Sequence, residues 1–270
     1  MRGLVGAGHD VAVVVSRPDK RRGRGGGPAP SPVKAAAVEL GLPVSEEPAD
    51  AAGVGAELAV VVAYGRILRP PLLGALPLVN LHFSLLPRWR GAAPVERAIL
   101  AGDERTGVCL MGVVAELDAG PVYRRVVTPI GPDETAGELR RRLATLGRDL
   151  LLAGLAAGLG EPEPQQGEPT YAAKLTPAEL HLDWGRPAAE LARVVRAGRA
   201  WTTAGGKRLL VLGARAVDGP GPGAPGTLDG PLVTTGGGRL RLALVQPEGR
   251  APVEAGAWLR GARQVRVLGS

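Results

Sequence analysis

The sequence predicts an α/β domain with a mostly parallel, doubly wound sheet, followed by a small β-barrel domain. Over residues 1–160, short β-branched runs alternate with helical segments, a pattern typical of parallel sheets covered by helices. A segment rich in proline and glutamine, 161–173, then indicates a linker. Residues 174–270 contain short strands separated by Gly and Pro turns, the rhythm of small barrels. We therefore expect two domains joined at 161–173.

In the first domain, β-branched runs predict strands at 9–16, 57–65, 76–84, 106–114 and 120–130. A helix between the first two strands would complete a βαβ unit, with Ser31 as its N-cap, Pro32 in its first turn and Gly41 after its end. A second helix, 95–103, is closed by Gly102.

The strongest helical pattern spans 135–160. Thr135 and Glu138 have capping-box spacing. The apolar residues that recur every three or four positions are Leu139, Leu143, Leu146 and Leu150. After the linker we expect a short helix at 187–199 and strands within 206–217 and 226–249.

Composition limits the class of protein. Hydrophobic residues make up 45% of the 270 positions, enough for a sizeable core. The single cysteine, Cys109, excludes an intramolecular disulfide and a cysteine-cluster metal site. No apolar run reaches the ~20 residues of a membrane helix, and the N-terminus lacks the pattern of a signal peptide. The sequence therefore predicts a soluble cytoplasmic protein without a membrane partner.

Positive charge is concentrated in two places. Residues 171–270 hold 14 Lys and Arg against 7 Asp and Glu, which accounts for the whole net charge of +7. Within the balanced remainder, the segment 17–34 carries six basic residues and one acidic residue. Two basic surfaces suggest a polyanionic partner such as nucleic acid. Ordinary solubilising charge explains the composition equally well.

Asn80 and His82 are two residues apart in the strand 76–84, so their side chains share one face near its carboxyl end. Open α/β sheets bind ligands at that end of their strands. Leu81 and Phe83 point the other way and are expected in the core. The alternative is that the asparagine and the histidine are packed residues satisfied by backbone groups.

Asp118 is the third candidate, because it lies in a turn after an apolar strand and precedes Gly120; Glu116 is the alternative carboxylate. An amide and an imidazole can stabilise an oxyanion on a carbonyl, while a carboxylate sets the proton of the imidazole or accepts one from an amine. The sequence has no Gly-x-Ser-x-Gly elbow and no paired catalytic cysteine. Direct acyl transfer to an amine is the chemistry that fits.

These motifs closely resemble the 10-formyltetrahydrofolate-dependent formyltransferases. The similarity rests on NLHFSLLP at 80–87, the RWRGAAP that follows, and LDAG with Asp118 thirty-six residues after His82. SLLPRWRGAAPVERAI resembles the methionyl-tRNA branch more narrowly. The segment 17–34 is similar to the basic loop of that branch, VVVAYGRIL to its pterin-side strand end, and the last hundred residues to its OB-like barrel, appended to a Rossmann-like catalytic domain.

The resemblance implies transfer of a formyl group from 10-formyltetrahydrofolate to the α-amine of methionyl initiator tRNA. We expect the protein to act as a monomer and to use no metal. Asn80 and His82 would hold and polarise the formyl oxygen, and Asp118 would set the protonation of His82 and help to remove the amine's proton. The folate site would be lined by Ser84, Leu85, Leu86, Pro87, Ile67 and Leu68. The residues expected to contact tRNA are Arg21, Arg22, Arg24, Arg196, Arg199, Lys207 and Arg208.

Two alternatives to this function stay open. One is a folate-dependent formyltransferase that acts on a small amine, and the other is an inactive tRNA-binding remnant. Members of the family normally open with a strand and a Gly-Thr-Pro-type loop before the segment GAGHDV, whereas this chain begins within the helix that follows. We expect either a true start upstream of Met1 or a truncated copy whose activity is impaired.

Overall fold

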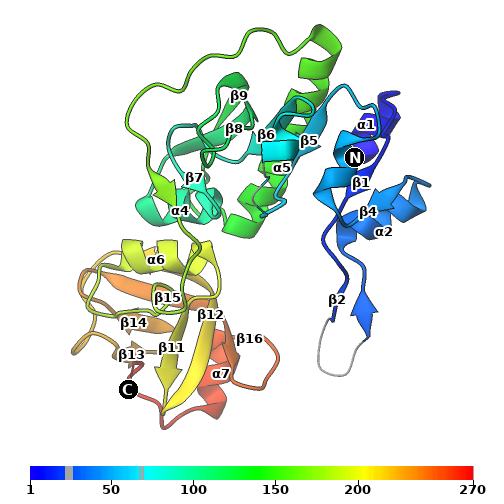
Figure 1. Ribbon diagram of the computed structural model, residues 1–270. Helices are drawn as coiled ribbons and strands as arrows, with labels where there is room; N and C mark the ends of the chain where they lie inside the picture. The colour runs from blue at the N-terminus through cyan, green and yellow to red at the C-terminus, as the bar shows by residue number, and fades with distance from the viewer. Residues whose placement is uncertain (22–26, 67, 69, 270) are drawn as a thin grey trace. The chain divides into compact units, whose positions relative to one another are not determined.

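The computed structural model describes residues 1–21, 27–66, 68 and 70–269, and it divides into two compact units (Figure 1). The first unit comprises Met1–Ala92, Gly107–Val127 and Leu143–Tyr171. The second unit comprises Ala93–Thr106, Thr128–Arg142 and Ala172–Ser270. Within the described residues, no helix combines the length and the apolar character that crossing a bilayer requires.

The N-terminal segment of the first unit contains the predicted βαβ unit, but with a different second strand. β1 (Val14–Val15) pairs in parallel with β4 (Val44–Ser45), and α2 (Pro32–Glu39) connects them. The prediction that the strand at 57–65 pairs with the first strand was wrong. The chain needs only four residues after α2 to return and form β4 beside β1. The capping prediction is confirmed: Ser31 Oγ accepts the N–H of Lys34, and Pro32 opens the helix.

The sheet that carries the site has four strands, in the order β5 (Ala59–Val61), β6 (Leu78–His82), β8 (Arg105–Gly112) and β9 (Val122–Pro129). β5 and β6 are parallel, whereas β6 and β8 are antiparallel, with Asn80 opposite Met111 and His82 opposite Cys109. The structure therefore confirms an α/β fold that contains parallel strands. The sheet that carries the site, however, is mixed. The remaining elements of this part are α1 (Arg2–Gly6), β2 (Lys20–Arg21), β3 (Pro28–Ala29), η1 (Pro48–Ala52), α3 (Pro70–Leu73) and β7 (Arg90–Gly91).

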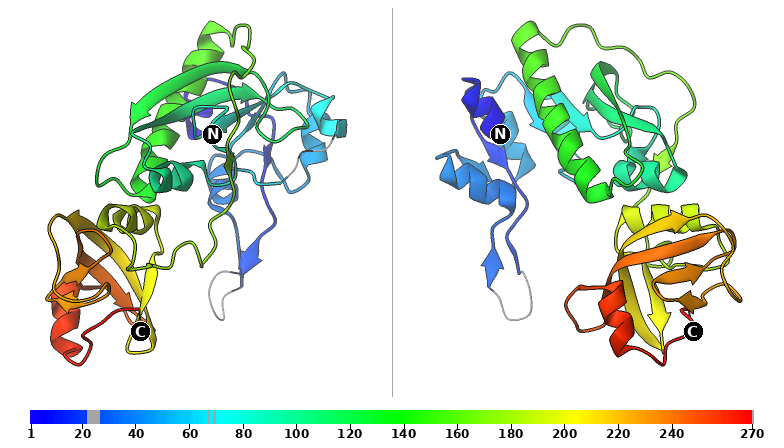
Figure 2. Two further views of the ribbon diagram at one scale, coloured as in Figure 1. Left: turned by 90° about the vertical axis from the view of Figure 1, so that its left-hand side faces the viewer. Right: turned by 180° about the vertical axis from the view of Figure 1, so that it is seen from behind.

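The long helix α5 (Ala136–Ala157) lies along one face of this sheet (Figures 1 and 2). Leu139 and Leu143 are completely buried, as their spacing predicts. Gly147 allows the close approach, since a Cβ there would lie 3.4 Å from a methyl group of Val108 and 3.6 Å from one of Leu81. The helix therefore supports β6 and β8 from behind, the two strands that lead into the site.

The C-terminal part of the second unit is an antiparallel sheet in the order β11-β12-β15-β14-β13, with β16 paired to β15. α6 (Ala188–Ala197) packs against β12 and β15, and the core between them includes Leu191, Leu209, Val211 and Leu240. The strands are β11 (Trp201–Ala204), β12 (Lys207–Val217), β13 (Leu228–Asp229), β14 (Leu232–Thr234), β15 (Arg239–Pro247) and β16 (Val253–Glu254). The other elements are α4 (Pro94–Ala101), β10 (Tyr171–Ala172) and α7 (Ala255–Gly261).

Candidate active site

Asn80, His82 and Asp118 converge at the end of β6, as the sequence predicts. Nδ2 of Asn80 lies 3.4 Å from Oδ1 of Asp118, and Nδ1 of His82 lies 3.5 Å from Oδ2 of the same carboxylate. The His82 side chain is only 6% exposed and that of Asp118 14%. The three groups therefore surround one small volume that is largely shielded from water.

The contacts of His82 determine where a proton must lie. Nε2 is 2.8 Å from the carbonyl oxygen of Trp89, and because a carbonyl oxygen only accepts, Nε2 must carry hydrogen. Nδ1 faces the Asp118 carboxylate across 3.5 Å. An imidazole and a carboxylate placed in this way can exchange protons with a reacting group.

The Asp118 carboxylate is also held from its other side. The backbone N–H of Gly91 in β7 donates to Oδ2 of Asp118 at 2.8 Å. Asp118 itself has a φ of 48°, in the left-handed region that a non-glycine residue rarely occupies. Trp89, whose carbonyl contacts His82, has a φ of 63°. Such conformations persist where surrounding contacts enforce them, and they concentrate at functional sites.

Sequence reasoning missed Arg90 and Gln165. The Arg90 guanidinium is buried, with NH1 3.2 Å from Oε1 of Glu116, and with Nε and NH2 donating to Oε1 of Gln165 at 3.0 and 2.8 Å. Gln165 lies in the segment predicted as a linker. Its partners are brought close only by the fold, so no local pattern indicates its role. For Arg90, the sequence offered one signal, which was its position in RWRG directly after Trp89.

The predicted folate-lining residues fall into two groups. Ser84 is completely buried and its hydroxyl donates to the carbonyl of Arg88 at 2.6 Å, while Leu86 packs in a core cluster with Cys109 and Met111. Their side chains shape the turn after β6. Leu85, Pro87 and Leu68 are each partly exposed. Ile67 lies outside the described residues.

Of the predicted tRNA contacts, Arg21, Arg199, Lys207 and Arg208 are exposed. The Arg208 guanidinium lies 4.4 Å above the ring of Trp201, a cation-π contact. Arg22 and Arg24 lie outside the described residues. Arg199 has a φ of 61° and lines a hollow of about 360 Å³ together with Arg140, Arg196 and the start of α5.

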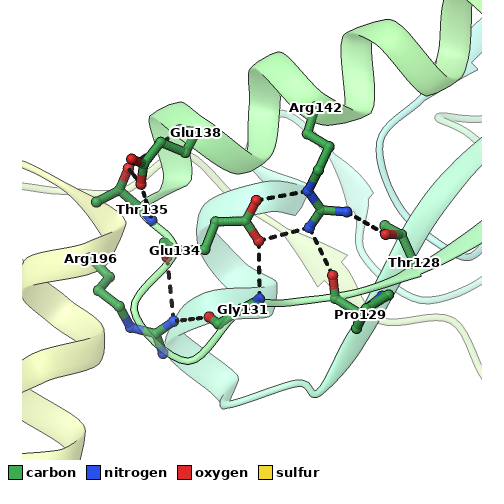
Figure 3. A network of polar contacts seen from close by, with 8 residues as sticks. All are labelled: Thr128, Pro129, Gly131, Glu134, Thr135, Glu138, Arg142 and Arg196. Atoms are coloured by element: carbon green, nitrogen blue, oxygen red, sulfur yellow. Dashed lines mark hydrogen bonds and ion pairs between the residues drawn. The ribbon is translucent and has the colours of Figure 1, made fainter.

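Arg196 has structural partners (Figure 3). Its NH1 donates to the carbonyl oxygens of Gly131 and Glu134, at 3.2 and 3.3 Å. Burial lowers the pKa of this guanidinium, and the neighbouring Arg193 adds to the effect. The same loop is fixed from its other side by Arg142, which donates to the Glu134 carboxylate. Arg196 thus joins α6 to the loop that precedes α5.

A family model described as formyl transferase matches residues 4–155, and one described as formyl transferase, C-terminal domain, matches residues 174–263. A protein of Dinoroseobacter shibae named methionyl-tRNA formyltransferase is 46% identical over 275 residues, which cover 96% of this chain and 91% of the relative. A protein of Acidothermus cellulolyticus with the same name is 44% identical over 303 residues, covering 97% and 93%.

Solved structures show the same fold at lower identity. HypX from Aquifex aeolicus in complex with tetrahydrofolic acid has a TM-score of 0.63 at 20% identity, over 82% of this chain and 43% of that one. The N-formyltransferase from Helicobacter canadensis, bound to folinic acid and dTDP-3-aminofucose, has a TM-score of 0.62 at 16% identity, over 77% and 81%. These likenesses concern the fold.

Proposed function

The chain belongs to the methionyl-tRNA formyltransferase family, and we propose that Asn80, His82 and Asp118 perform the transfer for which its relatives are named. The enzyme transfers the formyl group of 10-formyltetrahydrofolate, its co-substrate, to the α-amine of methionyl initiator tRNA, for translation initiation. The observation that carries the assignment of residues is the convergence at the end of β6, where the amide of Asn80 and the imidazole of His82 each lie within 3.5 Å of the Asp118 carboxylate.

The reaction needs three contributions that these side chains can make. The amine nitrogen bonds to the formyl carbon, and the bond from that carbon to N10 of the folate breaks. The amine loses one proton, and N10 gains one. Charge builds up on the formyl oxygen meanwhile, and N–H groups aimed at that oxygen stabilise it. Asn80 provides one such N–H, and His82 provides another when the formyl oxygen shares or replaces the Trp89 carbonyl as acceptor.

Asp118 completes the proton transfer. It lies beside Nδ1 of His82, so its negative charge favours the protonated imidazole that the developing oxyanion requires. As a base it also takes part in removing the proton of the attacking amine. A rigid carboxylate suits both tasks, and the N–H of Gly91 fixes it.

We place the folate co-substrate at the turn that follows β6. Leu85 and Pro87, which are partly exposed, would contact the folate through their side chains, and Leu68 would lie near the pterin through its backbone. Ser84 and Leu86 would line the site through the backbone that their buried side chains hold. We assign Ile67 to the pterin side on the resemblance alone. Among the described residues, no group of three His, Cys, Asp or Glu side chains could hold a metal, and the transfer as written needs none.

The tRNA contacts are assigned to the exposed basic residues Arg21, Arg199, Lys207 and Arg208, because Lys and Arg bind phosphates without regard to sequence. Arg22 and Arg24, which belong to the same basic segment 17–34 of the sequence as Arg21, are assigned to tRNA on the resemblance alone. Arg196 lines the same hollow as Arg199, although its guanidinium also holds the loop before α5. The enzyme is expected to act as a monomer in the cytoplasm.

The domain organisation that we propose is a Rossmann-like catalytic domain at 1–160, a linker at 161–173 and an OB-like barrel at 174–270. Support for barrel closure comes from the C-terminal segment, which bridges both edges of the antiparallel sheet. Leu268 bridges to Ala204 at the end of β11, and Val267 bridges to Thr227 next to β13. A sheet whose two edge strands are joined in this way has few exposed edges.

The experiment supplies purified protein with formyl-labelled 10-formyltetrahydrofolate and methionyl initiator tRNA. Label in the aminoacyl ester supports the proposal. Label only in small amines, such as an amino sugar nucleotide, would mean a different acceptor. Salt-sensitive binding of tRNA without any turnover would mean an inactive relative. Omission of the folate is the control.

A further inference from the structure

The loop that carries Asp118 requires an external support. It connects β8 and β9, and its outer residues are exposed: Leu117 by 60% of its surface and the Glu116 side chain by 70%. The loop has little apolar burial of its own, and Asp118 holds a left-handed backbone conformation. Loops with few buried contacts open easily, so contacts from elsewhere must fix the carboxylate that faces His82.

Gln165 supplies two of these contacts. Its Nε2 donates to the carbonyl oxygens of Asp118 and Gly120, both at 2.8 Å. A side-chain amide carries two N–H groups, and here both go to one short stretch of backbone. Gly120 is itself tightly packed, since a Cβ there would lie 1.9 Å from the carbonyl oxygen of Gly112. The amide of Gln165 therefore joins Asp118 to the rigid end of β8.

Arg90 fixes the direction of this amide. Its guanidinium can only donate, and two of its nitrogens contact Oε1 of Gln165. The amide oxygen must face Arg90, and both N–H groups must face the loop. Gly91, the next residue, donates its backbone N–H to the Asp118 carboxylate. The short strand β7 thus holds the carboxylate directly and, through Gln165, the backbone behind it.

The segment around Gln165 is itself attached to the residues beside His82. The hydroxyl of Thr170 accepts the N–H of Trp89 at 2.9 Å, and the carbonyl of Thr170 accepts the N–H of Arg90 at 2.8 Å. The same segment therefore braces the carbonyl that contacts His82 and the loop that bears Asp118. A linker whose only task is to join two domains would not need these contacts.

We propose that Gln165 is a positioning residue for formyl transfer, which holds the Asp118 carboxylate against His82 and Asn80 without touching the substrates. This inference rests on the proposed function of the site. A small misplacement of a reacting group can cost on the order of 10²-fold in rate. Gln165→Leu, which removes both donors at similar size, should lower kcat by about 10- to 100-fold and leave KM for tRNA within about twofold.

Two further variants make the test specific. Gln166→Leu is the matched control, because Gln166 is exposed, and it should keep the kcat of the unchanged chain. Gln165→Glu keeps the acceptor for Arg90 but turns an oxygen toward two carbonyl oxygens, which is repulsive until the carboxyl is protonated. Its rate relative to the unchanged chain should therefore rise as the pH falls from 8 to about 5, toward the usual range of a carboxyl pKa.

A readout that does not need activity separates this inference from the proposed function. Backbone amides of residues 116–120 should exchange hydrogen faster in Gln165→Leu than in Gln166→Leu, with both variants melting cooperatively. If the unchanged chain forms no formyl-methionyl ester, the proposed function fails. The exchange data then still test whether Gln165 holds the loop that carries Asp118. An unchanged kcat in folded Gln165→Leu overturns the proposal. If that variant does not fold, a Gln165→Glu variant with the wild-type rate at every pH overturns it.

Discussion

The side chains of Asn80 and His82 lie on the same face of β6 but have different surroundings. His82 is fixed at both ring nitrogens, by the Trp89 carbonyl and by Asp118. Asn80 is held by one contact at 3.4 Å, a distance that leaves it a weak hydrogen bond. The first group is therefore preorganised, and the second is available to a ligand.

This difference leads to a prediction for alanine variants. His82→Ala and Asn80→Ala should each lower kcat by at least about 10²-fold, the usual effect of removing an oxyanion donor or a general acid-base group. Single-turnover formylation with labelled donor measures the rate, and a filter-binding titration measures tRNA affinity. The affinity should change little. A parallel loss of both would mean that these side chains support the fold.

Asp118→Asn tests the charge of the third group at nearly constant shape. The amide can still accept the N–H of Gly91, but it cannot favour a protonated His82 or take a proton from the amine. We expect kcat to fall by about 10²-fold or more, with the melting temperature within a few degrees of that of the unchanged chain. Full activity in this variant would move the base to another group, and Glu116 is then the one to replace next.

At the scale of elements, the loop before α5 is held in part by a half-buried ion pair. Glu134 accepts from Nε and NH2 of Arg142 at 2.8 and 2.7 Å and from the N–H of Gly131 at 3.0 Å (Figure 3). The hydrogen bond from Arg142 is the main reason why the pKa of Glu134 lies below its ordinary value. A carboxyl whose pKa falls on folding stabilises the fold above its unfolded pKa, and this effect disappears as the pH falls through the folded value.

Glu134→Gln should therefore lower the free energy of unfolding by about 1–2 kcal/mol at neutral pH, since it removes a charge-assisted contact. The deficit should shrink below about pH 4.3, where the unfolded carboxyl is protonated. Urea unfolding at several pH values measures it. Asp149→Asn is the control, because its pair with Arg148 is more than half exposed and should contribute little. A deficit that is constant with pH would refute the electrostatic account.

Elements with strong local signals were predictable from the sequence. Ser31 caps α2, Thr135 and Glu138 form the capping box of α5, and Gly102 ends α4 with a φ of 76°. Each of these signals involves residues within four positions of one another. Strand partners are set by distant contacts, and for this reason β4 was missed as the partner of β1.

The residues of the site also differ in whether a local signal or a distant contact brings them together. Asn80 and His82 share a strand face by periodicity alone, so the sequence could place them together. Asp118 came from a turn pattern and from the resemblance to known enzymes. Arg90 and Gln165 lie 75 residues apart and meet through their side chains, and Gln165 in turn donates to two backbone carbonyls, which every residue has. The position of Arg90 in RWRG was a local signal, but no residue pattern could have indicated Gln165 as its partner.

For the whole molecule, the distribution of charge bears on how a large polyanion is bound. The net charge of +7 comes entirely from residues 171–270. Some of the basic residues there are already neutralised: Arg186 pairs with Glu190 at 2.6 Å, and Arg215 with Asp133 at 3.0 Å. Lys207 and Arg208 are exposed, and Arg208 is stacked on Trp201. A stacked guanidinium is held ready for a phosphate at a lower entropic cost than a free one.

Binding of tRNA should consequently depend on salt through these two residues. Each phosphate contact that is lost reduces the slope of log K against log salt by roughly 0.7 to 0.9, so replacing both Lys207 and Arg208 with alanine should reduce it by about 1 to 2. Fluorescence titrations of labelled methionyl tRNA from 50 to 300 mM salt measure the slope. Arg186→Ala is the matched control, because that charge is already paired, and it should leave the slope as it is. A change in Arg186→Ala half as large as that in the double variant would reduce the effect to net charge, since one charge is removed there and two in the double variant. No change in the double variant would place the phosphates on another surface.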